Sequence, residues 1–288
     1  MNLTDISTVH GLCERHGFSL SKSFGQNFIV NPGVCPKIVE ASGIDGTFGV
    51  IEIGPGIGVL TREIAKRAKK VVAIEVDERL PAILDETLAE CPNVRLVMGD
   101  VLKTDLAALI RKEFPGLRVA VCANLPYYIT SPIVMKLLEE KLPIESITVM
   151  VQHEAAQRLC AEPGTREAGA VTYAVHYYAK PQLLFTVKPG SFFPPPKVTS
   201  AVIRLELHRE RPVAPRDEAA MFRTVRAAFG QRRKTAVNSV SAGLGMPKDR
   251  VAAAFAAAGI EPAARAERIP LEGYAALSDA LFPETDQK

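Results

Sequence analysis

Several familiar signals are absent from this sequence. Its five cysteines (positions 13, 35, 91, 122 and 160) form no CxxC pair, and its five histidines are scattered along the chain. This spacing argues against a zinc site and against a disulfide framework, so we expect no bound metal. Isolated cysteines fit a reducing, cytoplasmic location best.

Other absences narrow the class of protein further. No apolar run approaches the ~18 residues that a membrane-spanning helix needs, so we expect no membrane partner. Residues 1–17 lack a basic start followed by an apolar core, and no secretory signal is expected. The GxxxxGK[ST] pattern of a phosphate-binding P-loop is missing, and no Ser-His-Asp signature stands out. With 47% hydrophobic and 23% charged residues, the 288-residue chain fits a soluble globular protein with one large and one small domain.

Acidic side chains are missing from one stretch near the C-terminus. Residues 219–248 contain six basic side chains and no acid. Residues 1–210 carry 23 basic and 23 acidic side chains, so the net charge of +3 comes from the 12 basic and 9 acidic side chains of residues 211–288. A basic, acid-free stretch is a candidate contact for a nucleic-acid backbone. The alternative is a solvated helix face.

Short apolar runs alternate with helical patterns through the first half of the chain. We expect strands at 50–53, 71–74, 94–98, 117–122 and 147–151. The helices expected around them cover residues 3–17, 32–39, 59–69, 77–90, 105–113 and 132–140. This alternation predicts an α/β fold in which helices cover both faces of a mostly parallel sheet.

The pattern changes after residue 165. A helix at 170–178 precedes two strands, 183–187 and 198–207, which we expect to form an antiparallel hairpin at the sheet edge. The proline-rich residues 189–197 are expected to form a loop between them. Residues 211–215 suggest a linker, and helical spacing follows at 217–229, 231–241, 248–258 and 272–281. We therefore predict a first domain at 1–210 and a small all-α domain at 211–288.

Polar and glycine residues follow four of the expected strands. They are the turn Gly54–Gly58, Glu75, Asp100 and Asn124. Ligands of open parallel sheets bind at the C-terminal ends of the strands, so these residues are expected to converge. The glycine turn would let a ligand approach the backbone. Glu75, 21 residues after Gly54, could accept hydrogen bonds from ribose hydroxyls, and Asp100 from the amine of adenine.

Each of these features also has a simpler explanation. The glycines could serve only to pack the strand exit, Glu75 could cap the next helix, and Asp100 could be a turn residue. The three together favour a site for an adenine nucleoside. The turn has the spacing GxGxG rather than the GxGxxG of dinucleotide-binding proteins, and a nicotinamide-dependent oxidoreductase is an alternative that titration with NAD would test.

The tetrad from Asn124 to Tyr127 forms an unusual strand exit. The amide of Asn124 offers one acceptor and two donors. Pro126 fixes its own φ and holds Leu125 in extended geometry, so that the carbonyl groups can be aimed. Tyr127 adds a flat face, and the four residues together could hold a planar heteroaromatic amine. A plain strand exit with an Asn turn is the alternative.

Several segments of the chain together match one known family. They are 23–28, 52–58, Glu75, Gly99–Asp100, 124–127, 192–198 and 231–235. In these segments the chain resembles the KsgA/RsmA family of S-adenosylmethionine-dependent small-subunit rRNA adenine N6-dimethyltransferases. The glycine turn is shared with most class I methyltransferases, whereas the segments at 23–28, 124–127 and 231–235 are more specific.

The resemblance implies both a fold and a reaction. The fold is a class I methyltransferase sheet of the Rossmann-like type, with a helical C-terminal domain that binds rRNA. The reaction is the dimethylation, with S-adenosylmethionine as cofactor, of N6 in two adjacent adenosines of the 3′-terminal hairpin of 16S rRNA. The expected partner is that rRNA in a pre-30S particle, and the expected role is small-subunit biogenesis by a monomeric enzyme.

The resemblance also implies roles for individual residues. Asn27 and Ile29 would line the methionine end of the cofactor, and Tyr127 and Phe192 would stack on the extruded adenine. The residues expected to bind the cofactor are Gln26, Asn27, Ile29, Gly54, Gly56, Glu75, Asp100 and Asn124. Those expected to act on the target base are Asn124, Leu125, Pro126, Tyr127 and Phe192. Those expected to bind RNA are Arg223, Arg226, Arg232, Arg233 and Lys234.

Three residues depart from the family pattern. Tyr128 stands where the family more often has Asn, Phe24 replaces a usual Leu, and Thr199 replaces a usual Asp. Two related functions remain as alternatives. One is an rRNA methyltransferase of the antibiotic-resistance type, which modifies a large-subunit adenine. The other is a nucleic-acid-binding relative that has lost the chemistry.

Overall fold

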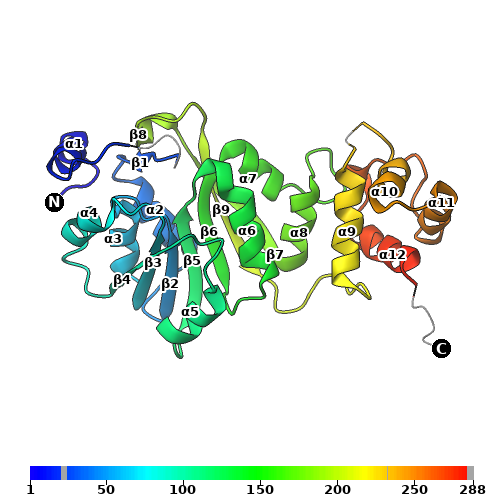
Figure 1. The fold of residues 1–288 in the computed structure, drawn as a ribbon, viewed down its shortest axis with the longest axis horizontal. Coiled ribbons are helices and arrows are strands. Elements are labelled where there is room, and N and C mark those ends of the chain that lie inside the picture. The colour runs from blue at the N-terminus through cyan, green and yellow to red at the C-terminus, as the bar shows by residue number, and fades with distance from the viewer. Residues whose placement is uncertain (21–24, 232, 284–288) are drawn as a thin grey trace. The chain divides into compact units, whose positions relative to one another are not determined.

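A computed structural model describes residues 1–20, 25–231 and 233–283 (Figure 1). By its internal contacts the chain divides into two compact units. The sheet unit consists of Met1–Ala156 and Pro181–Leu207, and the helical unit of Gln157–Lys180 and the residues from His208 onward. In the part of the chain that is described, none of the helices is both long enough and apolar enough to cross a membrane.

The sheet unit is built on a seven-stranded sheet with the strand order β4-β3-β2-β5-β6-β9-β7. The pairs β3–β4, β2–β3, β2–β5 and β5–β6 are parallel, and β9 runs antiparallel to β6. The sheet is therefore mostly parallel, as the sequence predicted, and β7 and β9 are neighbours at its edge. The strands are β2 (Phe48–Ile53), β3 (Lys70–Glu75), β4 (Val94–Met98), β5 (Arg118–Asn124), β6 (Ser146–Gln152), β7 (Ala179–Val187) and β9 (Ser200–Leu207).

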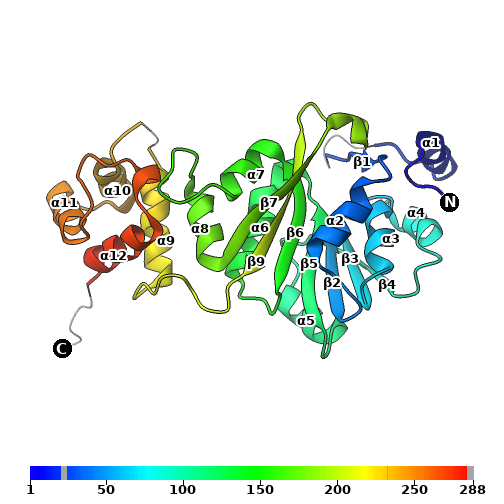
Figure 2. The ribbon, with the colours of Figure 1, turned by 180° about the vertical axis from the view of Figure 1, so that it is seen from behind.

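Helices cover both faces of this sheet, with α6 in front of it in Figure 1 and α2 in front of it in the reverse view of Figure 2. Most are shorter than the sequence pattern predicted, because their last residues form turns, and α7 was not predicted. The helices are α1 (Ile6–Arg15), α2 (Val34–Ser42), α3 (Val59–Ala65), α4 (Pro81–Thr87), α5 (Leu106–Glu113), α6 (Thr130–Glu139) and α7 (His153–Leu159).

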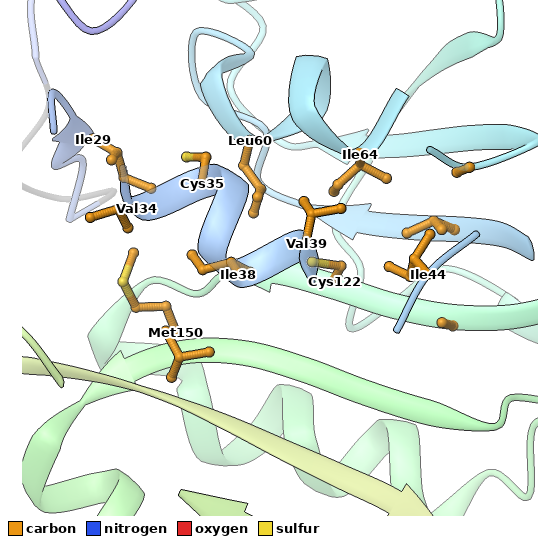
Figure 3. Packing of buried hydrophobic residues seen from close by; sticks show 14 of the residues in the cluster. Ile29, Val34, Cys35, Ile38, Val39, Ile44, Leu60, Ile64, Cys122 and Met150 are labelled. Atoms are coloured by element: carbon orange, nitrogen blue, oxygen red, sulfur yellow. The ribbon is translucent and has the colours of Figure 1, made fainter. Parts of the chain in front are cut away.

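The core beneath α2 shows how the sheet holds its covering helices. Ile38 and Val39 of α2 point toward Ile64 of α3 and toward Cys122 and Met150 of two central strands (Figure 3). All five side chains have 1% or less of their surface exposed. Central parallel strands that are buried on both faces require such continuous apolar sequence, and this core fixes the positions of the strand ends.

A second, two-stranded sheet was not predicted. β1 (Phe28–Ile29) pairs antiparallel with β8 (Phe192–Phe193), inside the segment expected to be a loop. The short 3₁₀ helix η2 (Pro189–Ser191) precedes β8, and the Ser191 carbonyl accepts a hydrogen bond of 2.8 Å from the N–H of Val30. The proline-rich segment is thus ordered by backbone pairing with residues about 160 positions earlier, which local sequence does not reveal.

The helical unit contains five α-helices and one 3₁₀ helix among the described residues. They are α8 (Ala170–Tyr178), α9 (Glu218–Phe229), α10 (Ala236–Leu244), α11 (Lys248–Ala257), η3 (Ala266–Arg268) and α12 (Leu271–Leu281). The helix expected at 231–241 begins only at Ala236. The N–H of Lys234 instead donates to the Gln231 carbonyl at 3.0 Å, which places Lys234 in a turn before this helix.

The contact-based units also differ from the predicted boundary at residue 210, because residues 157–180 group with the helical unit. The aromatic side chains of α8 explain the difference. The Tyr173 ring lies 4.8 Å from that of Tyr274 and 5.6 Å from that of Phe229, and Tyr178 stacks on Phe222 at 5.7 Å. Such aromatic pairs add to the energy of burial, and they attach α8 to α9 and α12.

Candidate active site

A cavity in the sheet unit lies at the C-terminal ends of β2, β3, β4 and β5. It encloses about 1030 Å³ of empty space, counting its open mouth. Its position is the one at which open parallel sheets bind ligands. Eleven of the residues singled out from the sequence line it, namely Gln26, Asn27, Ile29, Gly54, Gly56, Glu75, Asp100, Asn124, Leu125, Pro126 and Tyr127.

The glycine turn lines the cavity through Gly54 and Gly56. Gly54, Gly56 and Gly58 have φ angles of +69°, +59° and +88°, a conformation that other residues adopt only with strain. A Cβ atom on Gly54 would meet no other atom within 4 Å, so this part of the backbone faces open space. The glycines are therefore required by backbone geometry, and a ligand can approach the chain closely at Gly54.

Glu75 ends β3 in the wall of the cavity, with 5% of its surface exposed. Its Oε1 accepts hydrogen bonds from the backbone N–H groups of Val76 (2.8 Å) and Asp77 (2.9 Å). Burial raises the pKa of this carboxyl, while these hydrogen bonds oppose the rise. The carboxyl group is thus held in one orientation before any ligand binds.

Glu52 is a buried acid that the sequence analysis did not single out. It lies on β2, lines the same cavity, and has 1% of its surface exposed. Burial raises the pKa of Glu52 to about 8, and its Oε2 makes no hydrogen bond to any residue in the described ranges. At neutral pH the side chain is therefore mainly a neutral carboxylic acid with an unused acceptor in the cavity wall.

Asp100 lies beyond β4, where its carboxyl group is only partly buried. Its Oδ1 accepts a hydrogen bond of 2.9 Å from the N–H of Leu102, and Lys103 Nζ lies 4.0 Å from Oδ2. The turn role considered for Asp100 is therefore real. It does not compete with a binding role, because the turn fixes the carboxyl group at the cavity.

Asn124 is the last residue of β5, and its side chain makes no hydrogen bond within the part of the chain that the structure describes. Leu125, the next residue, is fixed in place, because its N–H donates to the Met150 carbonyl at 3.0 Å and its side chain is 1% exposed.

Tyr127 is half-buried, and its hydroxyl lies 2.7 Å from Ser200 Oγ. Burial raises the pKa of Tyr127, so its phenol is neutral. The amide is available at the cavity beside a fixed aromatic ring.

Gln26 and Asn27 bring the N-terminal segment to the cavity. Gln26 Nε2 donates to Asp77 Oδ2 at 2.8 Å, and Asp77 also binds the guanidinium group of Arg79 through contacts of 2.7 and 2.8 Å. The Arg79 guanidinium lowers the pKa of Asp77, which keeps it ionised. Gln26 therefore anchors the segment to the exit of β3. Sequence reasoning missed Asp77, although it stands two residues after Glu75.

Phe192 is not among the residues that line the cavity, so its predicted stacking role does not match its position. Its side chain is 3% exposed and packs in the core beneath α2. Pairing with Ile29 in the two-stranded sheet turns Phe192 into that core. Its neighbour Phe193 packs against the ring of His10 at 4.8 Å. Ser23 and Phe24, which belong to a segment of the predicted family pattern, lie outside the described residues.

Apolar side chains that sequence reasoning missed complete the walls. Val76 and Val101 follow Glu75 and Asp100 directly, and Tyr128 follows the tetrad. Val76 and Tyr128 expose 49% and 57% of their surfaces. Their positions directly after Glu75, Asp100 and the tetrad are the signal that could have identified them.

The predicted RNA-binding residues lie in the helical unit. Arg223 and Arg226 are exposed on α9 and line a groove that also includes Gln231 and residues of α10. Arg233 and Lys234 are exposed in the turn before α10. Arg232 lies outside the described residues. The described side chains thus form a basic surface in which Arg223 has one distant acidic neighbour, Asp217 at 4.0 Å.

No cluster of three or more His, Cys, Asp or Glu side chains suited to a metal occurs within residues 1–20, 25–231 and 233–283. The cavity offers instead acidic groups, an unbonded amide and flat apolar walls. Such a site suits an uncharged or cationic nucleoside derivative rather than a metal-bound phosphate.

Comparisons with known proteins identify the family to which the chain belongs. The ribosomal RNA adenine dimethylase family matches residues 17–281. The Ribosomal RNA small subunit methyltransferase A of Geobacillus thermodenitrificans is 50% identical over 273 residues, which cover 93% of each chain. Its Bacillus mycoides counterpart is 48% identical over 288 residues, or 97% of this chain and 98% of that one.

Solved structures show the same fold. A dimethyladenosine transferase from Plasmodium falciparum superposes with a TM-score of 0.70 at 25% identity, covering 87% of this chain and 95% of that one. The 23S rRNA methyltransferase ErmE gives a TM-score of 0.66 at 29% identity, covering 88% and 99%. On sequence and structure together, the chain belongs to the ribosomal RNA adenine dimethylase family.

Proposed function

We propose that this protein transfers methyl groups from S-adenosylmethionine to N6 of two adjacent adenosines in the 3′-terminal hairpin of 16S rRNA. The product is N6,N6-dimethyladenosine, and the reaction belongs to small-subunit biogenesis in the cytoplasm. One observation carries the proposal. The unbonded amide of Asn124 meets Glu75, Asp100 and the glycine turn of Gly54 in one cavity.

The cavity fits the cofactor. It is open to solvent and is lined by both polar and apolar residues. The buried carboxyl of Glu75 would accept hydrogen bonds from the ribose hydroxyls, and Asp100 from the adenine amine. The open backbone at Gly54 and the side chains of Asn27 and Ile29 would accommodate the methionine portion. When bound, S-adenosylmethionine supplies a methyl group attached to a positively charged sulfur.

Asn124 and Leu125 would prepare the target nitrogen. The lone pair of an adenine N6 is delocalised into the ring, which makes it a poor nucleophile. The side-chain carbonyl of Asn124 and the main-chain carbonyl of Leu125 would accept its two N–H bonds. This arrangement favours a pyramidal nitrogen whose lone pair points at the methyl group. The acceleration then comes mainly from positioning.

The transfer would be an in-line displacement. The bound cofactor would supply the methyl carbon to N6 and keep the electron pair of the broken carbon–sulfur bond on sulfur, while Asn124 and Leu125 hold N6 in position. The described residues that line the cavity include no histidine, cysteine or lysine. None is required, because the methylated N6 is an ammonium group that releases its proton to water after transfer. A second transfer repeats these steps on the monomethylated amine.

The adenine must leave its stack to reach the cavity, at a cost of a few kcal/mol. The ring of Tyr127 would offset part of this cost by stacking on the extruded base. The bond of 2.7 Å between its hydroxyl and Ser200 supports this role, because it restrains the ring before the base arrives. Aromatic stacking does not depend on base identity, so the amine contacts at Asn124 provide the selection for adenine.

The helical unit would hold the rRNA. Its exposed cations at Arg223, Arg226, Arg233 and Lys234, together with Arg232, would bind phosphate groups of a pre-30S particle. We propose that the protein acts as a monomer, since a substrate of this size needs no second active site. A charged rather than an apolar binding surface suits transient capture and release.

Sequence comparisons favour the small subunit over the large one. Identity to Ribosomal RNA small subunit methyltransferase A proteins reaches 46–50% over at least 93% of this chain, against 29% for the 23S rRNA methyltransferase ErmE. The intact tetrad of residues 124–127, together with Glu75 and Asp100, argues against a relative that has lost its chemistry.

A direct test is the transfer of labelled methyl groups to ribosomal particles, followed by mapping of the labelled bases. Small-subunit particles that lack the modification should acquire label on two adjacent adenosines near the 3′ end of their rRNA. Large-subunit particles serve as the control. Label on a large-subunit adenine, or on neither particle, would reject the proposal.

Glu75→Ala should weaken the binding of S-adenosylmethionine. Loss of hydrogen bonds to a charged group costs about 1.5–3 kcal/mol, or roughly 10- to 150-fold in Kd. Calorimetric titration measures this change. Glu78→Ala removes a neighbouring exposed carboxylate and should leave Kd unchanged, which controls for net charge. Unchanged affinity in Glu75→Ala would mean that the ribose is held by other groups.

The double variant Arg233→Gln/Lys234→Gln should bind small-subunit rRNA with a weaker dependence on salt. Each lost phosphate contact lowers the slope of log K against log salt concentration by about 0.7–0.9. Titrations at several salt concentrations measure that slope. Arg111→Gln/Lys112→Gln makes the same charge change at exposed positions of the sheet unit. Identical slopes for the two double variants would identify the residues before α10 as a solvated surface.

A further inference from the structure

Two consecutive tyrosines at the cavity have opposite surroundings. Both belong to the 3₁₀ helix η1 (Tyr127–Ile129) and both line the cavity. Tyr127 is half-buried and bonded to Ser200, whereas Tyr128 exposes 57% of its surface. Across the described ranges, Tyr128 is the one phenylalanine or tyrosine that is exposed rather than buried or half-buried. It therefore lies at the mouth of the cavity.

The Tyr128 ring is supported from one side. A Cβ atom placed on Gly25 would lie 3.5 Å from its Cδ1 and 3.7 Å from its Cε1, so the ring packs on the Gly25 backbone. Gly25 has a φ of +59°, which disfavours any larger residue there. The Tyr128 atoms nearest this position are ring carbons, so the contact with Gly25 is a contact of the ring. The exposed remainder of the ring is a flat apolar surface directed to solvent.

An exposed aromatic ring at this position can replace a stacking contact that the substrate loses. When an adenine is extruded into the cavity, the base next to it in the strand loses a stacking partner. Aromatic side chains replace such partners in proteins that bind single-stranded nucleic acid. The exposure of Tyr128 would be unfavourable in the free protein, and a nucleobase would cover it in the complex.

We propose that Tyr128 stacks on the purine base adjacent to the adenine that occupies the cavity. The inference rests on the proposed function, because it requires an extruded base. It makes Tyr128 a residue that captures the substrate strand, whereas Tyr127 contacts the base being modified. The two neighbouring rings then bind two neighbouring bases, and the ring at the mouth favours a substrate in which adenosines are adjacent.

Tyr128→Ala should raise the KM for small-subunit particles about tenfold, the loss expected for one base–aromatic stack. The kcat and the Kd for S-adenosylmethionine should stay within twofold of the wild-type values, since the contacts at Asn124 and Glu75 remain. Tyr128→Phe keeps the ring and should keep the wild-type KM. Tyr128→Asn introduces the residue that is more usual at this position in the KsgA/RsmA family, and it should behave like Tyr128→Ala because asparagine has no ring. Thermal melting of each variant checks that it folds.

Particles with an altered neighbouring base give the decisive comparison. Replacing the adjacent adenosine with uridine weakens stacking, so the wild-type protein should show a raised KM on these particles. Tyr128→Ala should show the same KM on both substrates. A tenfold difference between the two substrates that persists in Tyr128→Ala would overturn the proposal, as would a tenfold loss of cofactor affinity. No transfer by the wild-type protein to either particle would overturn the proposed function itself, and the role of Tyr128 with it.

Discussion

Asn124→Ala is expected to reduce the rate of methyl transfer by about 10²–10³-fold, the usual cost of removing one preorganised hydrogen-bonding group at a reacting atom. The side chain makes no other hydrogen bond with a described residue, so its loss should not disturb the fold. Leu125 would still accept one N–H bond through its main chain, which sets the limit on the loss. Single-turnover measurements with saturating substrate isolate this step.

Two comparisons separate this role from a role in binding. The Kd for S-adenosylmethionine should change little in Asn124→Ala, because Glu75 and Asp100 remain. Asn124→Asp keeps an oxygen acceptor at the same position and should retain more activity than the alanine variant. Near-normal turnover in Asn124→Ala, or a loss of rate that merely follows a loss of cofactor affinity, would remove Asn124 from its assigned role.

The sequence predicted the sheet and the strand ends because both depend on local pattern. Short, mainly apolar runs that lead to Gly54, Glu75, Asp100 and Asn124 are visible without any long-range information. The order of the strands was not predicted, and the expectation that their ends form one site needs only the rule that ligands bind where parallel strands end. The convergence of these residues on one cavity therefore follows from periodicity and spacing alone.

Other parts of the site depend on pairings that span the chain. Phe192 looks like a free loop aromatic until β8 pairs with β1 and turns it into the core. The amide of Gln26 looks available to a ligand, but it donates to Asp77, 51 positions later. Neither contact leaves a local signal, so sequence reasoning assigned both side chains to the ligand alone.

The sequence also does not show how the surroundings of two buried acids differ. Glu52 and Glu75 are acids on two neighbouring strands, and both line the cavity. Only Glu75 stood out, because it follows its strand, whereas Glu52 lies within one. Hydrogen bonding distinguishes them further, since backbone N–H groups bind the Glu75 carboxyl while Glu52 Oε2 lacks a partner among the described residues. Sequence periodicity cannot show which carboxyl is desolvated.

Glu52→Gln is expected to stabilise the cofactor-free protein increasingly as the pH rises from 5 to 8. In the unfolded chain Glu52 ionises above its ordinary pKa of 4.5, whereas burial holds the pKa of the folded state at about 8. Between these values folding must retain a proton that the unfolded chain releases, so wild-type stability falls as the pH rises. A glutamine cannot ionise and escapes this penalty. The advantage of the variant should grow by up to about 4 kcal/mol across this range.

Urea unfolding of both proteins at pH 5, 6.5 and 8 measures this difference, since all other titrating groups are shared and cancel. Glu78→Gln, at an exposed position of the same unit, should give a curve parallel to that of the wild type. If Glu52→Gln also ran parallel, Glu52 would be as ionised in the folded protein as in the unfolded chain. A diverging curve would mean that the cavity wall carries a neutral carboxylic acid at neutral pH. The presence of a carboxylic acid that lowers the stability of the fold would then indicate that Glu52 has a functional role in the site.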